Sequence, residues 1–427
     1  MRNGIISGIF AAAITVSGWA QSGTNSPYSQ FGIGLLTDQS QGVNRGMNGV
    51  GLALRRGNMV NTLNPASYSS VDSLTMIFDV GLSGQLTNFK ESGHSINARN
   101  ADFEYAVGSF RAMKNLGVSF GILPYSNVGY TYASSTYLNN TIGAIPETFT
   151  GSGGLHQLFV GAGYSPLKPL SVGFNVAYLW GTLDRSVSST ATTTVNSISK
   201  HYSATVNNYN LELGLQWEQP LGKKDVVTLG ATVGIGHNLA ADPECSIITI
   251  NSSTATSDTT NMSIRNGLRL PMTYGVGVSW NHAEKLTLAA DLTLQKWGAI
   301  DFPEYNDQQK KYMLRSGLLR DRKKINVGVD YVPGYMSRNL LNRVHYRAGA
   351  AYSTPYYYIN GANGPKELSV SAGLGIPLQN AWNNRSILNI SAQWVHTSAK
   401  DLITENTFRI NIGLTFNERW FAKLRIE

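Results

Sequence analysis

Leu170-Ser-Val-Gly-Phe-Asn-Val-Ala-Tyr-Leu-Trp180 alternates between two kinds of residue. Its even-numbered positions are all apolar or aromatic, whereas most odd-numbered positions are small or polar. Successive side chains of a β-strand point to opposite faces of the sheet, so this segment predicts a strand with one apolar and one polar face. A transmembrane barrel needs such strands, because its outer wall touches lipid and its interior holds water or a plug.

The same alternation continues from residue 72 to the end of the chain. About fourteen segments show it, each close to the 9–11 residues that a tilted membrane strand requires. An even number of strands closes the sheet and leaves no unpaired edge in lipid. The predicted fold class is therefore all-β, a transmembrane antiparallel β-barrel over residues 72–417, with strands near 74–87, 102–111, 115–123, 154–164, 170–182, 205–217, 226–236, 268–281, 285–296, 323–332, 343–353, 367–377, 386–396 and 407–417.

The connections between these segments support the strand count, because short and long joins alternate. Tight joins at 111–115 and 165–169 contrast with long joins at 124–153 and 183–204. If both termini are periplasmic, the long joins lie outside the cell. Aromatic residues gather near the segment ends, where the two membrane interfaces should lie: Trp180, Trp297 and Trp394 on the outer side, and Trp217, Trp280 and Tyr331 on the periplasmic side.

The two ends of the chain differ from the barrel. Residues 1–20 are predicted to be a signal peptide, because Arg2 precedes an apolar run and small residues flank a cut before Gln21. Residues 21–71 are glycine-rich, polar and weakly periodic, so they form either a disordered leader or a compact plug in the barrel. Residues 418–427 continue past the last strand as a predicted periplasmic tail. A signal peptide followed by membrane strands predicts the outer membrane of a Gram-negative bacterium.

Composition agrees with a lipid-embedded barrel. Charged residues make up only 14% of the chain, against about a quarter in typical proteins, while glycine (44) and tyrosine (21) are abundant. The net charge of +8 does not indicate nucleic acid, because the compartment is wrong; a solvated surface or contact with anionic lipid head groups explains it better. The single Cys245 cannot form an internal disulfide and lies among polar residues, so we expect an incidental loop thiol.

Two short motifs in the polar N-terminal segment carry a resemblance to a known family. Met47-Asn-Gly-Val-Gly-Leu-Ala53 is followed, after a gap, by Asn64-Pro65-Ala66 just before the first strand. With the long leader and the strand count, these motifs resemble the FadL/TodX family of outer-membrane transporters of hydrophobic compounds. The resemblance implies a barrel of about fourteen strands, an N-terminal hatch over residues 21–71, and passive uptake of small apolar molecules such as fatty acids or aromatic hydrocarbons.

The resemblance also implies a kink in the third strand that opens a lateral path. Gly121 and Pro124 lie where this kink is expected, and both residue types interrupt or bend a strand. The alternative is that Pro124 simply ends the strand. The chain departs from better-known members in its longer Tyr/Phe/Gly-rich leader and its C-terminal tail. These departures leave a second function open, that of a non-transporting barrel subunit of an outer-membrane protein assembly or secretion complex.

Charged residues on the inward phase of the strands are candidates for contacts with the hatch. Charges inside a barrel are costly unless they are paired or hydrated. Hatch arginines docked on wall carboxylates would satisfy both groups; the alternative is a hydrated lumen without specific pairs. The candidates for hatch-wall pairing are Arg45, Arg55 and Arg56 in the hatch, and Asp79, Glu104, Asp291 and Asp330 in the wall.

Two further groups of side chains are candidates for contacts at the outer surface. A basic loop could bind lipopolysaccharide phosphates or could simply be solvated; its residues are Lys310, Lys311, Arg315, Arg320 and Arg322. Tyrosines near the outer mouth are candidates for an apolar substrate pocket: Tyr130, Tyr132, Tyr356, Tyr357 and Tyr358. The expected partners are outer-membrane lipids, lipopolysaccharide, a hydrophobic small molecule and other outer-membrane proteins.

The sequence does not support catalysis. Gly117-Val-Ser119-Phe-Gly121 matches the Gly-x-Ser-x-Gly pattern of hydrolases, but the serine lies in mid-strand and no helix follows. The seven histidines have no metal-binding spacing, and no phosphate-binding glycine loop is present. We therefore expect no enzyme, no metal and no cofactor.

Overall fold

A computed structural model describes residues 23–418 except 138–143, 190–195, 252, 253, 255, 335, 336 and 379–385. The predicted signal peptide, and the predicted tail beyond its first residue, lie outside the described residues. Within the described part of the chain, no helix is long and apolar enough to cross a membrane.

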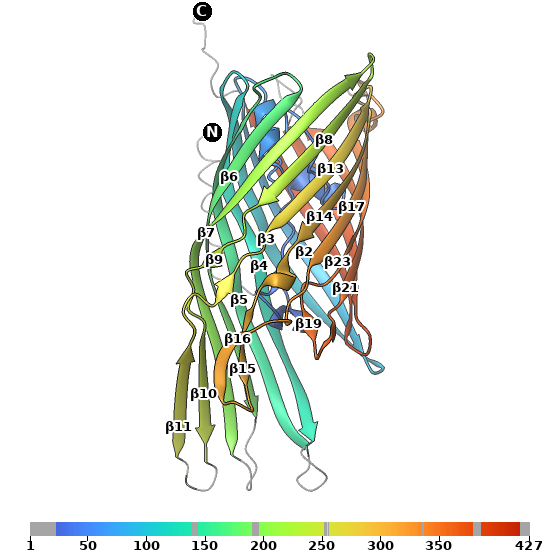
Figure 1. The fold of residues 1–427 in the computed structure, drawn as a ribbon. Coiled ribbons are helices and arrows are strands. Elements are labelled where there is room, and N and C mark those ends of the chain that lie inside the picture. The colour runs from blue at the N-terminus through green and yellow to red at the C-terminus, as the bar shows by residue number, and fades with distance from the viewer. Residues whose placement is uncertain are drawn as a thin grey trace, which may run out of the picture.

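In the described residues, the strands form a closed antiparallel barrel (Figure 1). The main sheet has 17 strands, of which β1, β10 and β11 are additions and the other 14 make the wall, as predicted. The first and last wall strands pair from Met76↔Glu418 to Lys90↔Thr404, which closes the ring. The wall strands are β2 (Met76–Glu91), β3 (His94–Met113), β4 (Leu116–Tyr137), β5 (Ala144–Tyr164), β6 (Leu170–Ser189), β7 (Ser197–Leu221), β8 (Asp225–Gly234), β13 (Thr273–His282), β14 (Leu286–Gln295), β17 (Arg322–Tyr331), β18 (His345–Ser353), β21 (Lys366–Leu378), β22 (Ser386–Ser398) and β23 (Thr404–Glu418).

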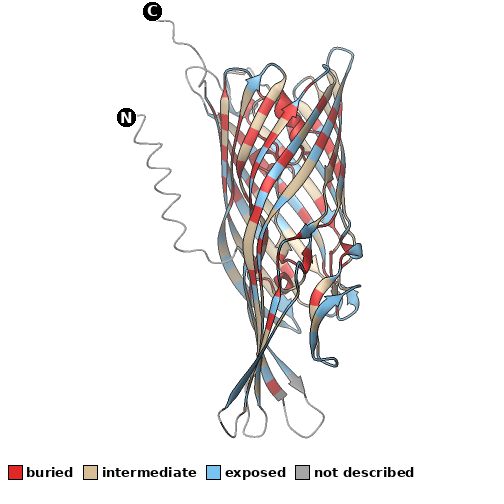
Figure 2. Cartoon of the chain, turned by 60° about the vertical axis from the view of Figure 1, so that its left-hand side comes forward, coloured by how far each residue is buried: buried red, intermediate tan, exposed pale blue. Residues whose placement is uncertain are grey.

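Burial confirms the predicted alternation of the two faces. On β23, Ile410 and Ile412 are 45% and 50% exposed on the outer wall, while Asn411 between them is 5% exposed and faces the lumen. Figure 2 shows buried and exposed residues alternating along the strands. The outward apolar side chains form the surface that lipid covers.

Short turns gather at one end of the barrel and long excursions at the other (Figure 1). Residues 165–169 join β5 to β6, and residues 283–285 join β13 to β14. One connection at the same end is longer and holds α3 (Leu340–Arg343). We call the two ends the short-turn end and the long-loop end; the sequence argument places them in the periplasm and outside the cell, respectively.

Five strands are much longer than predicted; one of them is β3, which has 20 residues and begins at His94. β4, β5, β6 and β7 have 22, 21, 20 and 25 residues and occupy much of the predicted loops 124–153 and 183–204. At the long-loop end they continue, with β10 (Glu244–Ile250) and β11 (Ser257–Ser263), as a projection that we call the outer sheet. These segments are rich in Ser, Thr and Gly and have no apolar face for lipid, so the alternation did not predict them.

Two side chains lie elsewhere than the sequence predicted. Cys245 is not in a loop: it lies in β10 opposite Tyr202 of β7, where strand pairing buries it. Trp297 is not at the membrane interface: it begins η4 (Trp297–Ala299) and is only 1% exposed. The chain turns over the barrel mouth after β14, so the Trp297 ring packs on Tyr356, with 4.8 Å between centroids.

Small paired strands lie at the long-loop end. They are β9 (Asn238–Leu239) with β12 (Leu268–Arg269), β15 (Phe302–Asn306) with β16 (Lys311–Arg315), and β19 (Tyr358–Ile359) with β20 (Ala362–Asn363).

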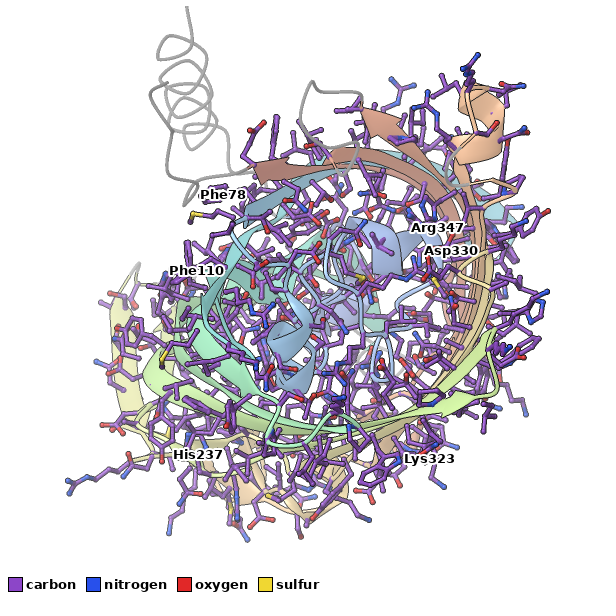
Figure 3. The ribbon with its side chains drawn as sticks, turned by 90° about the horizontal axis from the view of Figure 1, so that it is seen from above. Phe78, Phe110, His237, Lys323, Asp330 and Arg347 are labelled. Carbon is purple, nitrogen blue, oxygen red and sulfur yellow. The ribbon has the colours of Figure 1, made fainter. Side chains whose placement is uncertain are left out.

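Most residues of the N-terminal segment are buried inside the barrel (Figure 3). This agrees with a compact plug and not with a disordered leader. Its elements run from η2, which packs on β4, to η3, which packs on β5 and β6 just before β2 begins. We call residues 23–71 the hatch; it contains η2 (Pro27–Gln30), β1 (Leu35–Leu36), α2 (Gly42–Gly46) and η3 (Pro65–Ser70).

Candidate functional site

The Asn64-Pro65-Ala66 motif starts the last helix of the hatch. The Asn64 side chain caps η3 by accepting a hydrogen bond from the Ala66 amide (3.1 Å), and Pro65 occupies the first turn, where its missing N–H is not needed. The Asn64 amide also donates to the carbonyl oxygens of Leu52 (2.7 Å) and Leu215 (3.2 Å). The motif therefore ties the helix start both to the hatch and to the wall.

A row of glycines on the wall receives this motif. Gly163, Gly173 and Gly214 are register neighbours on β5, β6 and β7. A Cβ atom at any of them would overlap Pro65 or the Asn64 side chain. The close approach of the hatch backbone therefore requires glycine here. The sequence did not lead us to predict this contact between hatch and wall. The signal for it was the glycines at inward-facing positions of the strands.

Arg45 of α2 makes a buried ion pair with Glu104 of β3. The distance from Nη2 to Oε2 is 2.8 Å, and the two side chains are 4% and 7% exposed. Arg45 Nε donates to the Ser40 carbonyl at 3.0 Å, and Nη1 donates to Asn411 Oδ1 at 3.2 Å. Glu104 Oε1 accepts from the Ser83 hydroxyl at 2.5 Å. The pair is thus hydrogen-bonded on both sides, which a buried pair needs in order to be stable.

Arg56 makes the second contact between a hatch arginine and a wall carboxylate. Its Nη1 lies 2.5 Å from Asp330 Oδ2, and its Nη2 donates to the Thr287 hydroxyl at 2.8 Å. Asp330 also contacts His345 (2.9 Å) and Arg347 (3.5 Å). Figure 3 shows Asp330 and Arg347 close together on the wall, facing the hatch.

Among the described residues, no ion pair involves the other three candidates for hatch-wall pairing, which are Arg55, Asp79 and Asp291. Arg55 has an Nη1 atom without a hydrogen-bond partner among the described residues. Asp79 instead accepts from the Tyr105 hydroxyl at 3.1 Å. Asp291 Oδ2 accepts from the amides of Gly51 (2.6 Å) and Leu52 (2.9 Å), so the wall holds the hatch backbone there.

One hatch carboxylate was not among the predicted residues. Burial alone would raise the pKa of Asp38, but the nearby Lys324 and Arg45, together with hydrogen bonds from Ser40, outweigh it and hold that pKa well below its usual range. Asp38 therefore stays ionised and adds a hatch-borne negative charge to the Arg45 cluster.

The wall has a seam between β3 and β4. Their pairing runs only up to Ala106↔Ile122, so residues 94–105 of β3 have no β4 partner in the described register. Pro124 does not end the strand, because β4 runs to Tyr137 with a register shift against β5 between Pro124 and Ser126. Gly121 lies where the two strands part, and a Cβ there would overlap the Ala106 carbonyl. The two expected kink residues thus flank the start of the seam.

The hatch occupies the inner side of the seam. Leu35 and Leu36 of β1 pair with Asn127 and Ser126 of β4. The Thr37 hydroxyl donates to the Pro124 carbonyl at 2.6 Å. Across the seam, the Asn127 amide donates to Asp102 Oδ2 of β3 at 3.2 Å.

The hatch also fills the predicted tyrosine pocket. Tyr130, Tyr356 and Tyr357 are buried in one cluster, and Phe31 of the hatch stacks on Tyr357 with centroids 5.1 Å apart. The Tyr356 hydroxyl donates to the carbonyls of Phe31 and Gly34. Tyr132 stacks on Phe149 and donates to Gln30 Oε1 at 2.9 Å. Tyr358 lies at the margin, beneath the Arg320 guanidinium at 5.5 Å.

The lumen beside the hatch keeps a small polar cavity. Its volume is about 200 Å³. Charges of both signs line it: Asp38, Asp102, Glu104, Arg322, Lys324, Glu367, Glu405 and Arg409. Such a lining suits water or small polar molecules and opposes an apolar one.

The five basic residues predicted to contact lipopolysaccharide lie in different surroundings. Lys310 and Lys311 are exposed at the turn of the β15–β16 hairpin. Arg315 pairs with Glu304 at 2.6 Å, and Arg320 donates to Asn363. Arg322 lines the lumen cavity. No metal-binding group of three or more side chains occurs within the described part of the chain.

Fold and site together define an outer-membrane barrel with an internal hatch. The fold is similar to that of the toluene transporter TbuX of Ralstonia pickettii, with a TM-score of 0.62 at 14% identity over 88% of this chain and 98% of that chain. A FadL homologue of Pseudomonas aeruginosa matches with a TM-score of 0.62 at 12% identity (90% and 99% covered), and the toluene transporter TodX of P. putida with 0.62 at 15% (90% and 100%). No curated protein matches the sequence.

The sequence itself points to a more specific group. A family model described as BamG matches residues 1–427, so the chain belongs to the BamG family.

Proposed function

We propose that this protein is a non-transporting barrel subunit of an outer-membrane protein assembly complex. The carrying observation is that the hatch fills the place where an apolar substrate would enter: Phe31 stacks on Tyr357, and Tyr356 holds the hatch backbone. Membership of the BamG family supports this choice of partner, because it suggests association with the BAM complex.

The energetics of the lumen support this proposal. An apolar molecule on the axial route would have to displace buried hatch residues such as Ile33, which is 1% exposed. It would then meet a cavity of about 200 Å³ lined by charged side chains. Removing water from those charges without replacing their hydrogen bonds is costly. In this proposal the hatch is a fixed brace, and the predicted tail, residues 418–427, is a periplasmic docking element.

The experiment compares a deletion strain with its parent. We expect abundances of many other outer-membrane barrels to fall together, and an affinity-tagged copy of the protein to purify with the central barrel of the assembly machinery. A deletion that leaves those abundances unchanged, with no such copurification, contradicts the proposal.

A second function, passive uptake of a small hydrophobic compound, is favoured by the seam at Gly121 and Pro124. A lateral exit would let an apolar molecule leave into lipid without crossing the polar lumen. Cysteines at Asp102 and Asn127, bridged by a short bis-maleimide, would close the seam while leaving the outer wall intact. Uptake of labelled toluene or oleate should then fall if the protein transports such compounds. The assembly subunit should retain its function with the seam bridged.

A further inference from the structure

At the long-loop end the β15–β16 hairpin lies beside the outer sheet (Figure 1). Residues of both line a second cavity. Its volume is about 560 Å³. The hairpin is fixed across the outer sheet: Lys200 Nζ lies 2.6 Å from Asp307 Oδ1, and the rings of Tyr202 and Tyr312 are 6.1 Å apart. Hatch residues 30–32 contribute to its lining. We call this space the outer cavity.

Arg185 of β6 gives the outer cavity its charge. Its guanidinium makes no ion pair with a carboxylate among the described residues. Nη2 donates to the Gly32 carbonyl, and the Phe302 ring lies 5.9 Å from Cζ. Nε is buried and has no hydrogen-bond partner in the described structure. Burying a guanidinium N–H without a hydrogen-bond acceptor costs free energy, and an anion bound to the group would offset that cost.

Glu304 and Arg315, the other charged side chains that line the outer cavity, neutralise each other, and Lys200 and Asp307 form a pair beside it. Glu304 pairs with Arg315 at 2.6 Å, and Asp307 pairs with Lys200 at 2.6 Å. Among the described residues that line the outer cavity, Arg185 therefore carries the charge that remains uncompensated. The arrangement favours a ligand with a single negative charge.

Tyrosines dominate the aromatic lining of the outer cavity: Tyr130, Tyr202, Tyr305, Tyr312, Tyr357 and Tyr358. A tyrosine offers an apolar ring face and a hydroxyl that both donates and accepts hydrogen bonds. A sugar ring matches both, because its C–H face stacks on aromatic rings while its hydroxyls bind the phenols. An alkyl chain or a plain arene would leave those hydroxyls without partners.

We propose that the outer cavity binds an acidic sugar whose carboxylate contacts Arg185. The sugar is either free or a unit of a polysaccharide on the cell surface; both sources share this chemistry. The proposal goes beyond the assembly function and does not depend on it, because the outer cavity lies outside the lumen.

The experiment titrates the folded barrel in detergent and follows binding by calorimetry. Glucuronate is the probe, and glucose and benzoate are the comparison ligands. We expect saturable binding of glucuronate. Glucose and benzoate should bind about tenfold or more weakly, because glucose lacks the carboxylate and benzoate lacks the sugar hydroxyls. A polyuronate that binds more tightly per chain than the monomer would assign the site to a surface polysaccharide; equal affinity would assign it to the free sugar.

Arg185→Gln should weaken glucuronate binding about tenfold to a hundredfold, as expected for loss of a charge-assisted hydrogen bond. Arg99→Gln, at an exposed arginine of β3 that does not line the outer cavity, is the matched control and should bind normally. Heat-dependent migration in gels verifies that each variant is folded. If Arg185→Gln does not fold, Tyr312→Phe tests the same cavity through the loss of one hydroxyl. Unchanged affinity in the folded variant, benzoate binding as tight as glucuronate, or no saturation by glucuronate up to about 10 mM would overturn the proposal.

Discussion

Arg45 of the hatch and Glu104 of β3 form an ion pair, 2.8 Å long, that is almost wholly withdrawn from solvent. Arg55, which lies in the same polar segment, has no comparable partner in the described structure. Comparing substitutions of the two arginines therefore distinguishes a general effect of positive charge in the hatch from the effect of one specific contact.

Arg45→Met should loosen the hatch. The substitution leaves Glu104 buried and unpaired, which costs on the order of 3–5 kcal/mol. Limited proteolysis should cut the variant between residues 30 and 60, whereas the unmutated barrel resists. Arg55→Met is the matched control and should remain resistant.

Replacing both partners offers a further check on the Arg45 contact. Arg45→Met combined with Glu104→Leu should restore much of the resistance, because apolar replacements of similar size often substitute for a buried pair without loss of stability. If the double variant is cut as fast as Arg45→Met alone, the unpaired carboxylate is not the cause.

The glycine row under the Asn64-Pro65-Ala66 motif makes a second prediction. Gly173→Ala places a methyl group against the Pro65 backbone, and such overpacking typically costs about 1–3 kcal/mol. The denaturant midpoint for barrel unfolding should fall. Gly84→Ala is the control, since a Cβ there meets no atom within 4 Å. Equal midpoints for the two variants would show that the hatch can shift away from the wall at no cost.

The sequence predicted the barrel better than the contacts inside it. Alternation sets which residues face lipid, so the fourteen wall strands and the phase of Ile412 followed from it. It does not set the stagger of neighbouring strands or the path of the hatch. Whether an inward carboxylate meets an arginine, as Glu104 does, or backbone amides, as Asp291 does, therefore stayed open. The outer sheet has no lipid-facing side and left no apolar period to detect.

The third prediction concerns the side chains of β23 that face lipid. Ile412→Arg should impair membrane assembly, because an arginine at mid-bilayer on the lipid face costs about 2–4 kcal/mol. Thr407→Arg on the same strand is the control: Thr407 lines the polar lumen cavity, where Glu367 and Glu405 can pair with the new charge. Folded protein in outer-membrane fractions measures both. If both variants lose folded protein from the membrane to the same extent, Ile412 does not face lipid.

The fourth prediction concerns Cys245, which reports on the outer sheet. Burial raises the pKa of this thiol to about 11, and Tyr202 lies opposite it on β7. At pH 8 only roughly 0.1% of such a thiol is thiolate, the form that reacts, compared with a substantial fraction of an ordinary cysteine. Maleimide should therefore label the native barrel very slowly at pH 8 and label the denatured protein rapidly. Because a thiol loses its proton as the pH rises, native labelling should speed up toward pH 10 if β10 stays paired. Labelling at pH 8 that is equally fast before and after denaturation would mean that β10 does not hold Cys245 against β7.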